Sequence, residues 1–283
     1  MLEFRPQGLD GAGLARRTYW RTVRPLRQAW LHRDISAADL AIASYPRSGN
    51  LWLRFLLLHL LIGRTPGHIE TLELVPHIGF HYDTPTLLPG GGRLLKSHEP
   101  YRRAYKRAVY LVRDPRDVAL SYFRHLQHRG SLLVSAEGQA QAFDRYLGAF
   151  LLGRHEPHGR WDRHVVSWLD AADAGRSNIF VMRYEQMRDN PRAELERLTT
   201  WLDLDAGADD LDAAVRDSSI EHMRALTRAF DDRSDERQGH EPGMFQLVGA
   251  GRVGGWHEML TSDQAGRFKV FNKAIACAGY DLA

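Results

Sequence analysis

The sequence predicts an α/β protein in which a central parallel sheet is flanked by helices on both faces. Short apolar segments alternate with longer segments of helical periodicity, and two of the apolar segments lead directly into a polar turn at the start of a helix. The 283 residues suffice for one large core, and no repeat or linker divides them. We expect a single domain over residues 1–283, with a helical segment at 1–38 and a lid loop at 229–250.

The expected strands are short and apolar, as buried parallel strands are. They span residues 40–44, 93–96, 108–112 and 179–183. The expected helices follow from apolar spacing and from start and stop signals. They span residues 51–62, 115–128, 143–152, 160–172, 191–202, 210–217, 220–228 and 263–278.

The turn after the first strand is polar and reads Tyr-Pro-Arg-Ser-Gly-Asn-Leu-Trp over residues 45–52. The N-terminus of the helix that follows offers free N–H groups and the positive end of the helix dipole. Arg47 adds a fixed positive charge, and Gly49 lets the backbone approach a ligand closely. The turn therefore predicts a phosphate site. It lacks the Gly-Lys-Ser/Thr ending of the Walker A motif, which argues against an ordinary nucleoside triphosphatase.

A second strand-to-helix turn begins at Arg113 and is also suited to an anion. Pro115 fits the first helical position, Asp114 fits the N-cap, and Asp117 lies where the acid of a capping box lies. We interpret Asp114 and Asp117 as helix-capping residues and Arg116 as a solvated surface charge. This turn therefore predicts a second anion site at the carboxyl edge of the sheet.

Lys96 and His98 are two residues apart at the end of a strand, so their side chains project to the same face. Arg47, His98 and Arg113 all fall at or just past carboxyl ends of strands, where α/β sheets bind ligands. Taken alone, His98 could equally be a structural, hydrogen-bonded histidine. Its position beside Lys96 and two anion sites favours a role in chemistry.

These segments together resemble the sulfotransferases that use 3′-phosphoadenosine 5′-phosphosulfate (PAPS), of the cytosolic type and in a bacterial-like form. Residues 45–52 are similar to the family's 5′-phosphosulfate loop, and Lys96-Ser97-His98 is similar to its Lys-Thr/Ser-His segment. Gly251, Gly254 and Trp256 match its C-terminal signature, but Gly249 and Ala250 replace an Arg-Lys pair. The resemblance implies a P-loop-like, nucleotide-binding sulfotransferase fold.

The resemblance also implies roles for single residues. His98 matches the general base, and Lys96 and Arg47 match charges that stabilise the leaving group. Arg113 and Ser121 match the pair that binds the 3′-phosphate of PAPS. The other expected contacts to PAPS are Ser48, Gly49, Asn50, Leu51, Trp52, Tyr184, Ser218, Ile220, Gly251 and Arg252, the last as a substitute for the missing pair.

The implied reaction transfers a sulfuryl group from PAPS to a hydroxyl of a small-molecule or carbohydrate acceptor and releases adenosine 3′,5′-bisphosphate (PAP). It needs no metal. Two alternatives stay open at this point: a kinase-like phosphotransferase with an atypical loop, and a catalytically silent nucleotide-binding protein. The acceptor and the oligomeric state stay unknown.

Composition narrows the class of protein further. A net charge of +3 without a basic, aromatic stripe argues against a nucleic-acid partner. The single cysteine, Cys277, excludes an intrachain disulfide. The longest apolar stretch, at 51–62, is too short to cross a bilayer, and no signal peptide is recognisable, so we expect a cytoplasmic protein. Segments 63–92, 129–138 and 230–249 are the expected acceptor-side loops.

Overall fold

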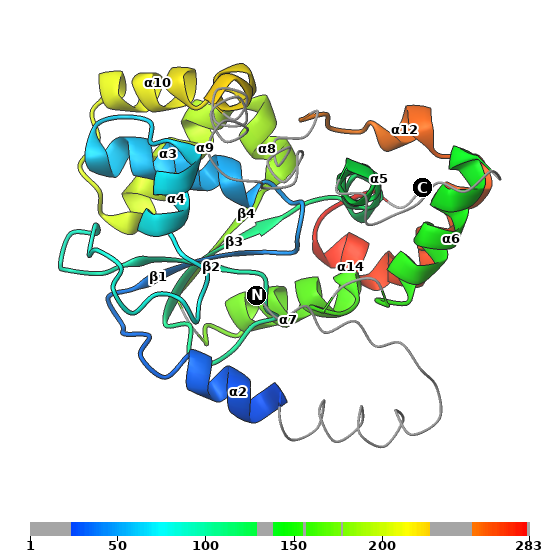
Figure 1. The fold of residues 1–283 in the computed structure, drawn as a ribbon, viewed down its shortest axis with the longest axis horizontal. Helices are drawn as coiled ribbons and strands as arrows, with labels where there is room; N and C mark the ends of the chain where they lie inside the picture. Colours follow the sequence, from blue (N-terminus) through cyan, green and yellow to red (C-terminus); the bar gives the residue numbers. More distant parts are fainter. Residues whose placement is uncertain (1–23, 129–137, 155–156, 177, 227–250, 282–283) are drawn as a thin grey trace, which may run out of the picture.

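Four parallel strands form the centre of the protein (Figure 1). The structure is a computed structural model that describes residues 24–128, 138–154, 157–176, 178–226 and 251–281. The strands lie in the order β2-β1-β3-β4, with β1 at Leu40–Ser44, β2 at Leu94–Ser97, β3 at Arg107–Val112 and β4 at Asn178–Arg183. The predicted fold class is confirmed, and each predicted strand lies within one residue of an observed one.

The register of the sheet brings the ends of three strands to one edge. Ala43 of β1 pairs with Ser97 of β2 on one side and with Tyr110 of β3 on the other. Because all the strands are parallel, the residues that follow β1, β2 and β3 lie side by side at the carboxyl edge.

Helices cover both faces of this sheet (Figure 1). Their bounds are α2 Arg24–Leu31, α3 Asn50–Ile62, α4 His68–Leu74, α5 Pro115–His128, α6 Gln139–Leu151, α7 Trp161–Asp173, α8 Tyr184–Asp189, α9 Pro191–Leu202, α10 Ala208–Asp217, α12 Trp256–Met259, α13 Ser262–Gly266 and α14 Asn272–Cys277. Residues 220–226 are also helical.

The side chains of alternate strand residues pack into two separate hydrophobic cores, one on each face of the sheet, because successive side chains of a strand point to opposite faces. Leu40 and Ile42 of β1 pack with α3, α9 and α10, whereas Ala41 and Ala43 pack with α5, α6, α7 and α14. A strand that is buried on both faces must be apolar throughout, which explains the apolar strand sequences.

The structure differs from the prediction in its short helices. Helix α4 occupies part of the expected loop at 63–92, and α8 and α12 were not expected. The expected helix at 263–278 is divided by a 3₁₀ segment at Arg267–Phe271. Side chains three apart eclipse in a 3₁₀ turn, and Phe268 and Phe271 both enter the core from it.

The N-terminal helix α2 packs on the domain. Its Gln28 Nε2 donates to Glu99 Oε1 at 3.2 Å, and its His32 Nε2 lies 2.8 Å from the hydroxyl of Tyr105. Pro25 lies in the first turn of α2 and does not interrupt it. Residues 1–23 and the whole of the expected lid loop at 229–250 lie outside the described residues. Of the helices in the described part, none is long and apolar enough to cross a membrane.

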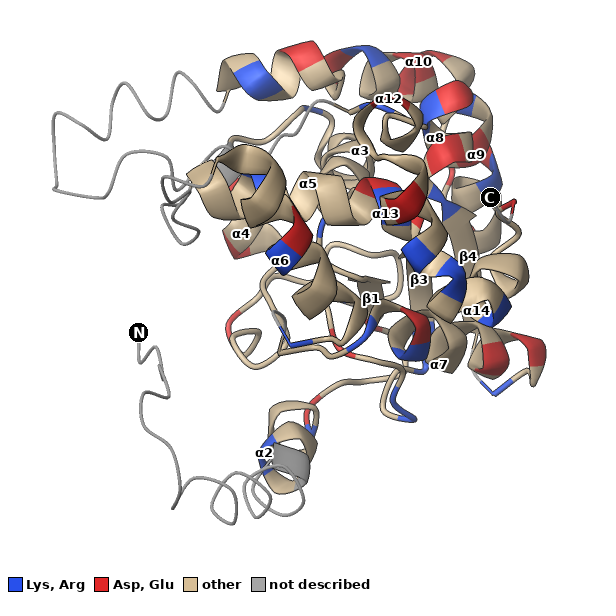
Figure 2. Ribbon diagram, turned by 90° about the vertical axis from the view of Figure 1, so that its right-hand side faces the viewer, with Lys and Arg blue, Asp and Glu red and all other residues tan. Residues whose placement is uncertain are grey.

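Charges of both signs alternate on the outer helices (Figure 2). On α9, for example, Arg192 pairs with Glu196 and with Asp212 of α10, at 2.9 Å in each case. Exposed pairs of this kind contribute little to stability. The ion pair between Arg93 and Asp39 at the start of the sheet differs from these because it is largely buried.

Asp39 and Arg93 precede β1 and β2 and hold the starts of these strands together. The Asp39 carboxylate accepts hydrogen bonds from Arg93 Nη2 at 2.7 Å, from the Arg93 backbone N–H at 2.9 Å and from the Ser36 N–H at 2.8 Å. Burial alone would raise the pKa of Asp39, but these hydrogen bonds outweigh it and lower the pKa to about 2.

Replacement of this carboxylate tests the arrangement. Asp39→Asn should destabilise the protein by about 2 kcal/mol near pH 7, because it removes a charged hydrogen-bond acceptor from a buried position. The lowered pKa means that the carboxylate stabilises the fold above about pH 4 and that this stabilisation is lost as the pH falls toward 2. Urea unfolding at pH 7 and pH 3 should show a smaller difference from wild type at pH 3. Asp212→Asn, in an exposed pair, is the control, and a pH-independent difference for Asp39→Asn would contradict the prediction.

Candidate active site

A cavity of about 850 Å³ opens at the carboxyl edge of the sheet. Most of the predicted site residues line it: Arg47, Gly49, Asn50, Leu51, Trp52, Lys96, His98, Arg113, Ser121, Tyr184, Ile220, Gly251 and Arg252. They come from the ends of the first three strands, from α3, α5 and α8, and from two segments near the C-terminus. Residues distant in the sequence therefore meet in one site.

Ser48 and Ser218 do not line this cavity. Both side chains are fully buried, and neither hydroxyl has a hydrogen-bond partner among the described residues. Ser48 lies within the first turn and Ser218 directly after α10. Direct contact of these two hydroxyls with a ligand in the cavity therefore has no support from the geometry.

The loop between β1 and α3 adopts an uncommon backbone conformation. Arg47 has a φ of 69° and Gly49 a φ of 96°, both in the left-handed region. A non-glycine residue rarely adopts this conformation unless its surroundings enforce it. Asn50 Nδ2 donates to the Ile42 carbonyl at 3.0 Å and so anchors the loop to β1. Such turns, followed by a helix N-terminus, present backbone N–H groups to an anion.

Arg113 joins the two strand-to-helix turns. Its Nη1 donates to the Arg47 carbonyl at 3.0 Å and its Nη2 to the Arg252 carbonyl at 2.8 Å. The guanidinium lies over the ring of Tyr184, 4.3 Å from the centroid. Arg47 Nε donates to Ser121 Oγ at 3.3 Å. The two turns are thus in contact, close enough for a single ligand to bridge them.

The cavity concentrates positive charge away from solvent. Burial, with a contribution from Arg113, lowers the pKa of Arg47 to about 10, and burial together with the nearby Arg54 lowers the pKa of Lys96 to about 8. Both side chains remain protonated at pH 7. Desolvated cations in mutual repulsion are stabilised when an anion enters.

His98 is held as a neutral imidazole with a defined orientation. Its Nδ1 lies 2.8 Å from the Ser44 carbonyl oxygen, which can only accept a hydrogen bond, so Nδ1 carries the proton and Nε2 is left with a lone pair. Burial, and then Lys96, His158 and His77, hold the pKa of His98 well below its ordinary value of 6.5. The residue therefore has the protonation state of a base.

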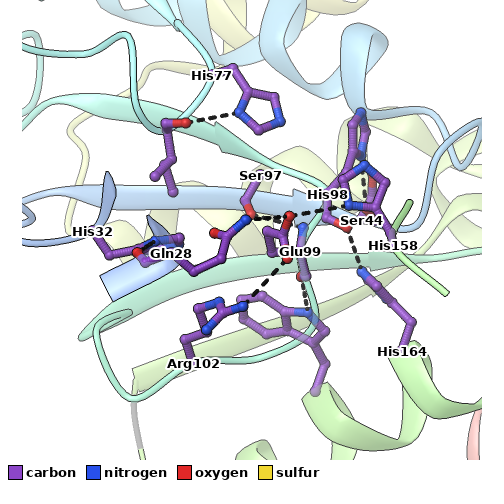
Figure 3. Close-up of polar contacts among 12 residues, drawn as sticks. Gln28, His32, Ser44, His77, Ser97, His98, Glu99, Arg102, His158 and His164 are labelled. Carbon is purple, nitrogen blue, oxygen red and sulfur yellow. Dashed lines mark hydrogen bonds and ion pairs between the residues drawn. The ribbon is translucent and has the colours of Figure 1, made fainter. Parts of the chain in front are cut away.

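A polar network surrounds the backbone at His98 and Glu99 (Figure 3). His164 Nε2 lies 3.1 Å from the His98 carbonyl oxygen, and the Nδ1 of His158 lies 3.4 Å from Glu99 Oε1. Glu99 also pairs with Arg102 at 3.5 Å. His158 itself lines the cavity, with its ring centroid 5.9 Å from that of His98. These contacts hold the backbone of residues 98–99, from which the imidazole of His98 projects.

The interpretation of the second turn needs two corrections. Asp114 caps α5 as expected, because its Oδ1 accepts from the Arg116 N–H at 2.8 Å. Arg116, however, is buried: it pairs with Asp114 at 2.6 Å and lies over the Trp256 ring, so the prediction of a solvated charge was wrong. Asp117 accepts from the N–H groups of Gly254 and Trp256, at 2.8 and 3.1 Å. The C-terminal segment covers this turn, and the carboxylate holds that segment instead of closing a capping box.

Sequence reasoning missed several lining residues. They are Arg54, Leu72, Asp117, Tyr122, Arg124, His125, His158, Arg224 and Met259. Arg54 gave a signal, since it is a charge within the apolar stretch at 51–58. Most of the others lie on helices whose pattern is that of an ordinary amphipathic helix, and His158 lies in the turn before α7, where no local pattern marks it.

Comparison with known proteins identifies the family. The sulfotransferase domain model matches residues 37–277. The chain belongs to the sulfotransferase domain family. This match confirms the predicted enzyme class and argues against the kinase-like alternative. The resemblance to cytosolic sulfotransferases is likewise confirmed, whereas its bacterial-like form stays a prediction.

Relatives and solved structures agree with this assignment. The rabbit (Oryctolagus cuniculus) amine sulfotransferase is 26% identical over 86% of this chain and 82% of its own, and mouse (Mus musculus) sulfotransferase 2A1 is 27% identical over 86% of both chains. Mouse sulfotransferase SULT7A1, complexed with PAP, matches with a TM-score of 0.64 at 22% identity over 87% of this chain and 86% of its own. Retinol dehydratase, in complex with retinol and PAP, matches with a TM-score of 0.67 at 15% identity over 92% and 88% of the two chains. Both structures share the fold of this sulfotransferase domain.

A pair of glycine variants tests the conformation of the first turn. A Cβ on Gly49 would lie 2.5 Å from Tyr184 Cδ2, whereas a Cβ on Gly63, at a φ of 71°, would meet no atom within 4 Å. Each Gly→Ala change should cost about 1 to 3 kcal/mol of backbone strain. Gly49→Ala should cost more than Gly63→Ala, because the Tyr184 ring beneath Arg113 must also move. Urea unfolding measures both, and equal losses would show that the close approach to Tyr184 is unimportant.

Proposed function

We propose that the protein transfers a sulfuryl group from PAPS to a hydroxyl group of a small-molecule or carbohydrate acceptor. The observation that carries this proposal is the meeting, in one cavity, of the Arg47 loop, Arg113 and a neutral, oriented His98. Membership of the family and the PAP-bound structures of similar fold support PAPS as the co-substrate. We further propose that residues 1–283 form one sulfotransferase domain.

In the proposed complex, the nucleotide bridges the two turns. The N–H groups of the loop at 47–52 and the Arg47 guanidinium bind the 5′-phosphosulfate, as expected at a helix N-terminus. Arg113 and Ser121 bind the 3′-phosphate at the second turn, with Arg252 supplying a further charge. Trp52, Tyr184, Ile220 and Gly251 enclose the adenosine. Gly249 and Ala250 lie outside the described residues.

His98 acts as the general base in this mechanism. Its Nε2 takes the proton of the acceptor hydroxyl while the hydroxyl oxygen attacks sulfur in line with the departing 5′-phosphate. Negative charge then develops on the oxygen between sulfur and phosphorus. Lys96 and Arg47 stabilise this charge, and because both side chains are largely buried, their interaction with it is screened less than at the surface. The residues need only position the two substrates and hold charge.

The acceptor would enter the part of the cavity that lies beside α4 and α5. Leu72 of α4, Tyr122 and His125 of α5 and Met259 line the same cavity. Of the three expected acceptor-side loops, 63–92 contributes α4, whereas 230–249 and nearly all of 129–138 lie outside the described residues. A cytoplasmic location stays a prediction.

A transfer assay tests the function and the base together. Purified protein with sulfur-labelled PAPS and a pool of hydroxylated acceptors should yield labelled product and PAP. His98→Asn should lower kcat by about 10²- to 10⁴-fold, because the acceptor loses its base, and should leave PAP binding by calorimetry unchanged. Mg-ATP should bind more weakly than PAP. Full turnover by His98→Asn would remove His98 from this role, and tight binding of ATP alone would refute PAPS as the donor.

The pH dependence of kcat/KM should reflect two shifted groups of the free enzyme. Because the pKa of His98 lies well below 6.5, the base stays neutral and kcat/KM should be flat as the pH falls from 7 to 6. Because the pKa of Lys96 is about 8, kcat/KM should fall above pH 8 as the stabilising charge is lost. Lys96→Arg keeps its charge and should lack this alkaline decline. A twofold or greater fall of the wild-type rate between pH 7 and 6 would contradict the neutral His98.

A further inference from the structure

Arg54 is a buried cation that the proposed mechanism does not use. It lies on α3, one helical turn after Asn50, between the apolar residues 51–53 and 55–58. Its side chain lines the cavity, yet the residue is only 3% exposed. A guanidinium in this position has lost most of its hydration.

The described residues offer Arg54 little in return. Its Nη1 donates to the Val75 carbonyl across a long 3.4 Å, and its Nε has no hydrogen-bond partner among the described residues. Burial lowers the pKa of Arg54 to about 10, and no carboxylate offsets this effect. Its positive charge in turn helps to lower the pKa of Lys96. Arg54 is therefore charged at neutral pH and unpaired within the described part.

The other buried arginines show what such a side chain requires. Arg116 forms an ion pair with Asp114, and Arg113 donates to two carbonyls and lies over the Tyr184 ring. A buried charge without a partner destabilises the fold, and an apolar side chain would suit this position better. An anion that enters the cavity would supply the partner that Arg54 lacks among the described residues.

We infer that Arg54 and Lys96 together form an oxyanion subsite beside His98. Under the proposed function, on which this inference rests, the oxyanion is either the sulfuryl group of PAPS or an acidic group of the acceptor. Each of these two groups would lie near Lys96 and would carry a single negative charge shared by its oxygens, which is the kind of group that a guanidinium binds. The subsite lies toward α4, because Arg54 contacts Val75 and Leu72 lines the cavity on the same side. It is thus distinct from the phosphate contacts at Arg47 and Arg113.

Three variants test the subsite. Arg54→Met removes the charge and keeps much of the length, Arg54→Lys keeps the charge, and Arg107→Met is the matched control. Arg107 also donates to a backbone carbonyl, that of Leu202 at 2.7 Å, but does not line the cavity. Calorimetry measures the binding of PAP, of PAPS and, to PAP-saturated protein, of inorganic sulfate and 4-hydroxybenzoate. The uncharged 4-hydroxybenzyl alcohol serves as the control for the last ligand.

The two sources of the oxyanion give different results. If it is the sulfuryl group, Arg54→Met should weaken PAPS binding by about tenfold or more, and sulfate binding likewise, while PAP binding is unchanged. If it is an acceptor acid, PAPS binding should be unchanged while 4-hydroxybenzoate loses about tenfold and 4-hydroxybenzyl alcohol does not. Arg54→Lys should retain part of the lost affinity. Unchanged binding of all these ligands by folded Arg54→Met would overturn the inference.

Thermal unfolding separates this role from a structural one. Without ligand, Arg54→Met should unfold at the same temperature as wild type or higher, because it removes an unpaired buried charge. Inorganic sulfate should raise the Tm of wild type and of Arg107→Met more than that of Arg54→Met. A marked fall in the Tm of ligand-free Arg54→Met, with an unchanged response to sulfate, would assign Arg54 to the fold alone. If wild type fails to bind PAP, the proposed function fails, and the response of the free protein to sulfate still decides the subsite.

Discussion

The Arg113 guanidinium holds the candidate site together. Its two hydrogen bonds to backbone carbonyls join the Arg47 loop to the segment at 251–256, and its third contact is the face of Tyr184. Carbonyl oxygens are weak partners for a cation compared with a carboxylate or phosphate. The same side chain can thus organise three segments and still interact with a ligand phosphate.

A shortage of acids distinguishes this cavity from the rest of the molecule. Elsewhere arginines meet carboxylates, at the start of the sheet with Asp39 and on the outer helices with Glu196 and Asp212. Within the cavity the carboxylate among the described lining residues is that of Asp117, and it accepts two backbone N–H groups. Arg252, at the rim, pairs with Glu258 at 3.2 Å, whereas no ion pair to a carboxylate is found among the described residues for Arg47, Arg54 or Lys96.

The sequence predicted those parts of the structure that depend on local patterns. Strand β1 and helices α5 and α9 have the predicted bounds, because apolar runs and a proline at the first helical position mark them. Lys96 and His98 share a face for the same local reason. The partners of Arg116 and Asp117 could not be predicted, since Trp256 and Gly254 reach them from almost 140 positions away in the chain. Arg54 was visible as a charge in an apolar helix, but only the packing around it shows that it lacks a partner.

The Ser44 carbonyl orients the imidazole of His98, and Ser44 is also the last residue of β1, directly before the loop that begins at Tyr45. One short stretch of backbone therefore determines both the shape of the anion cradle and the direction of the Nε2 lone pair. Under the proposed function, a nucleotide bound at this loop would restrain the peptide that accepts the hydrogen bond of His98. We therefore expect the orientation of the base to be more sharply defined once the donor is bound than in the free enzyme.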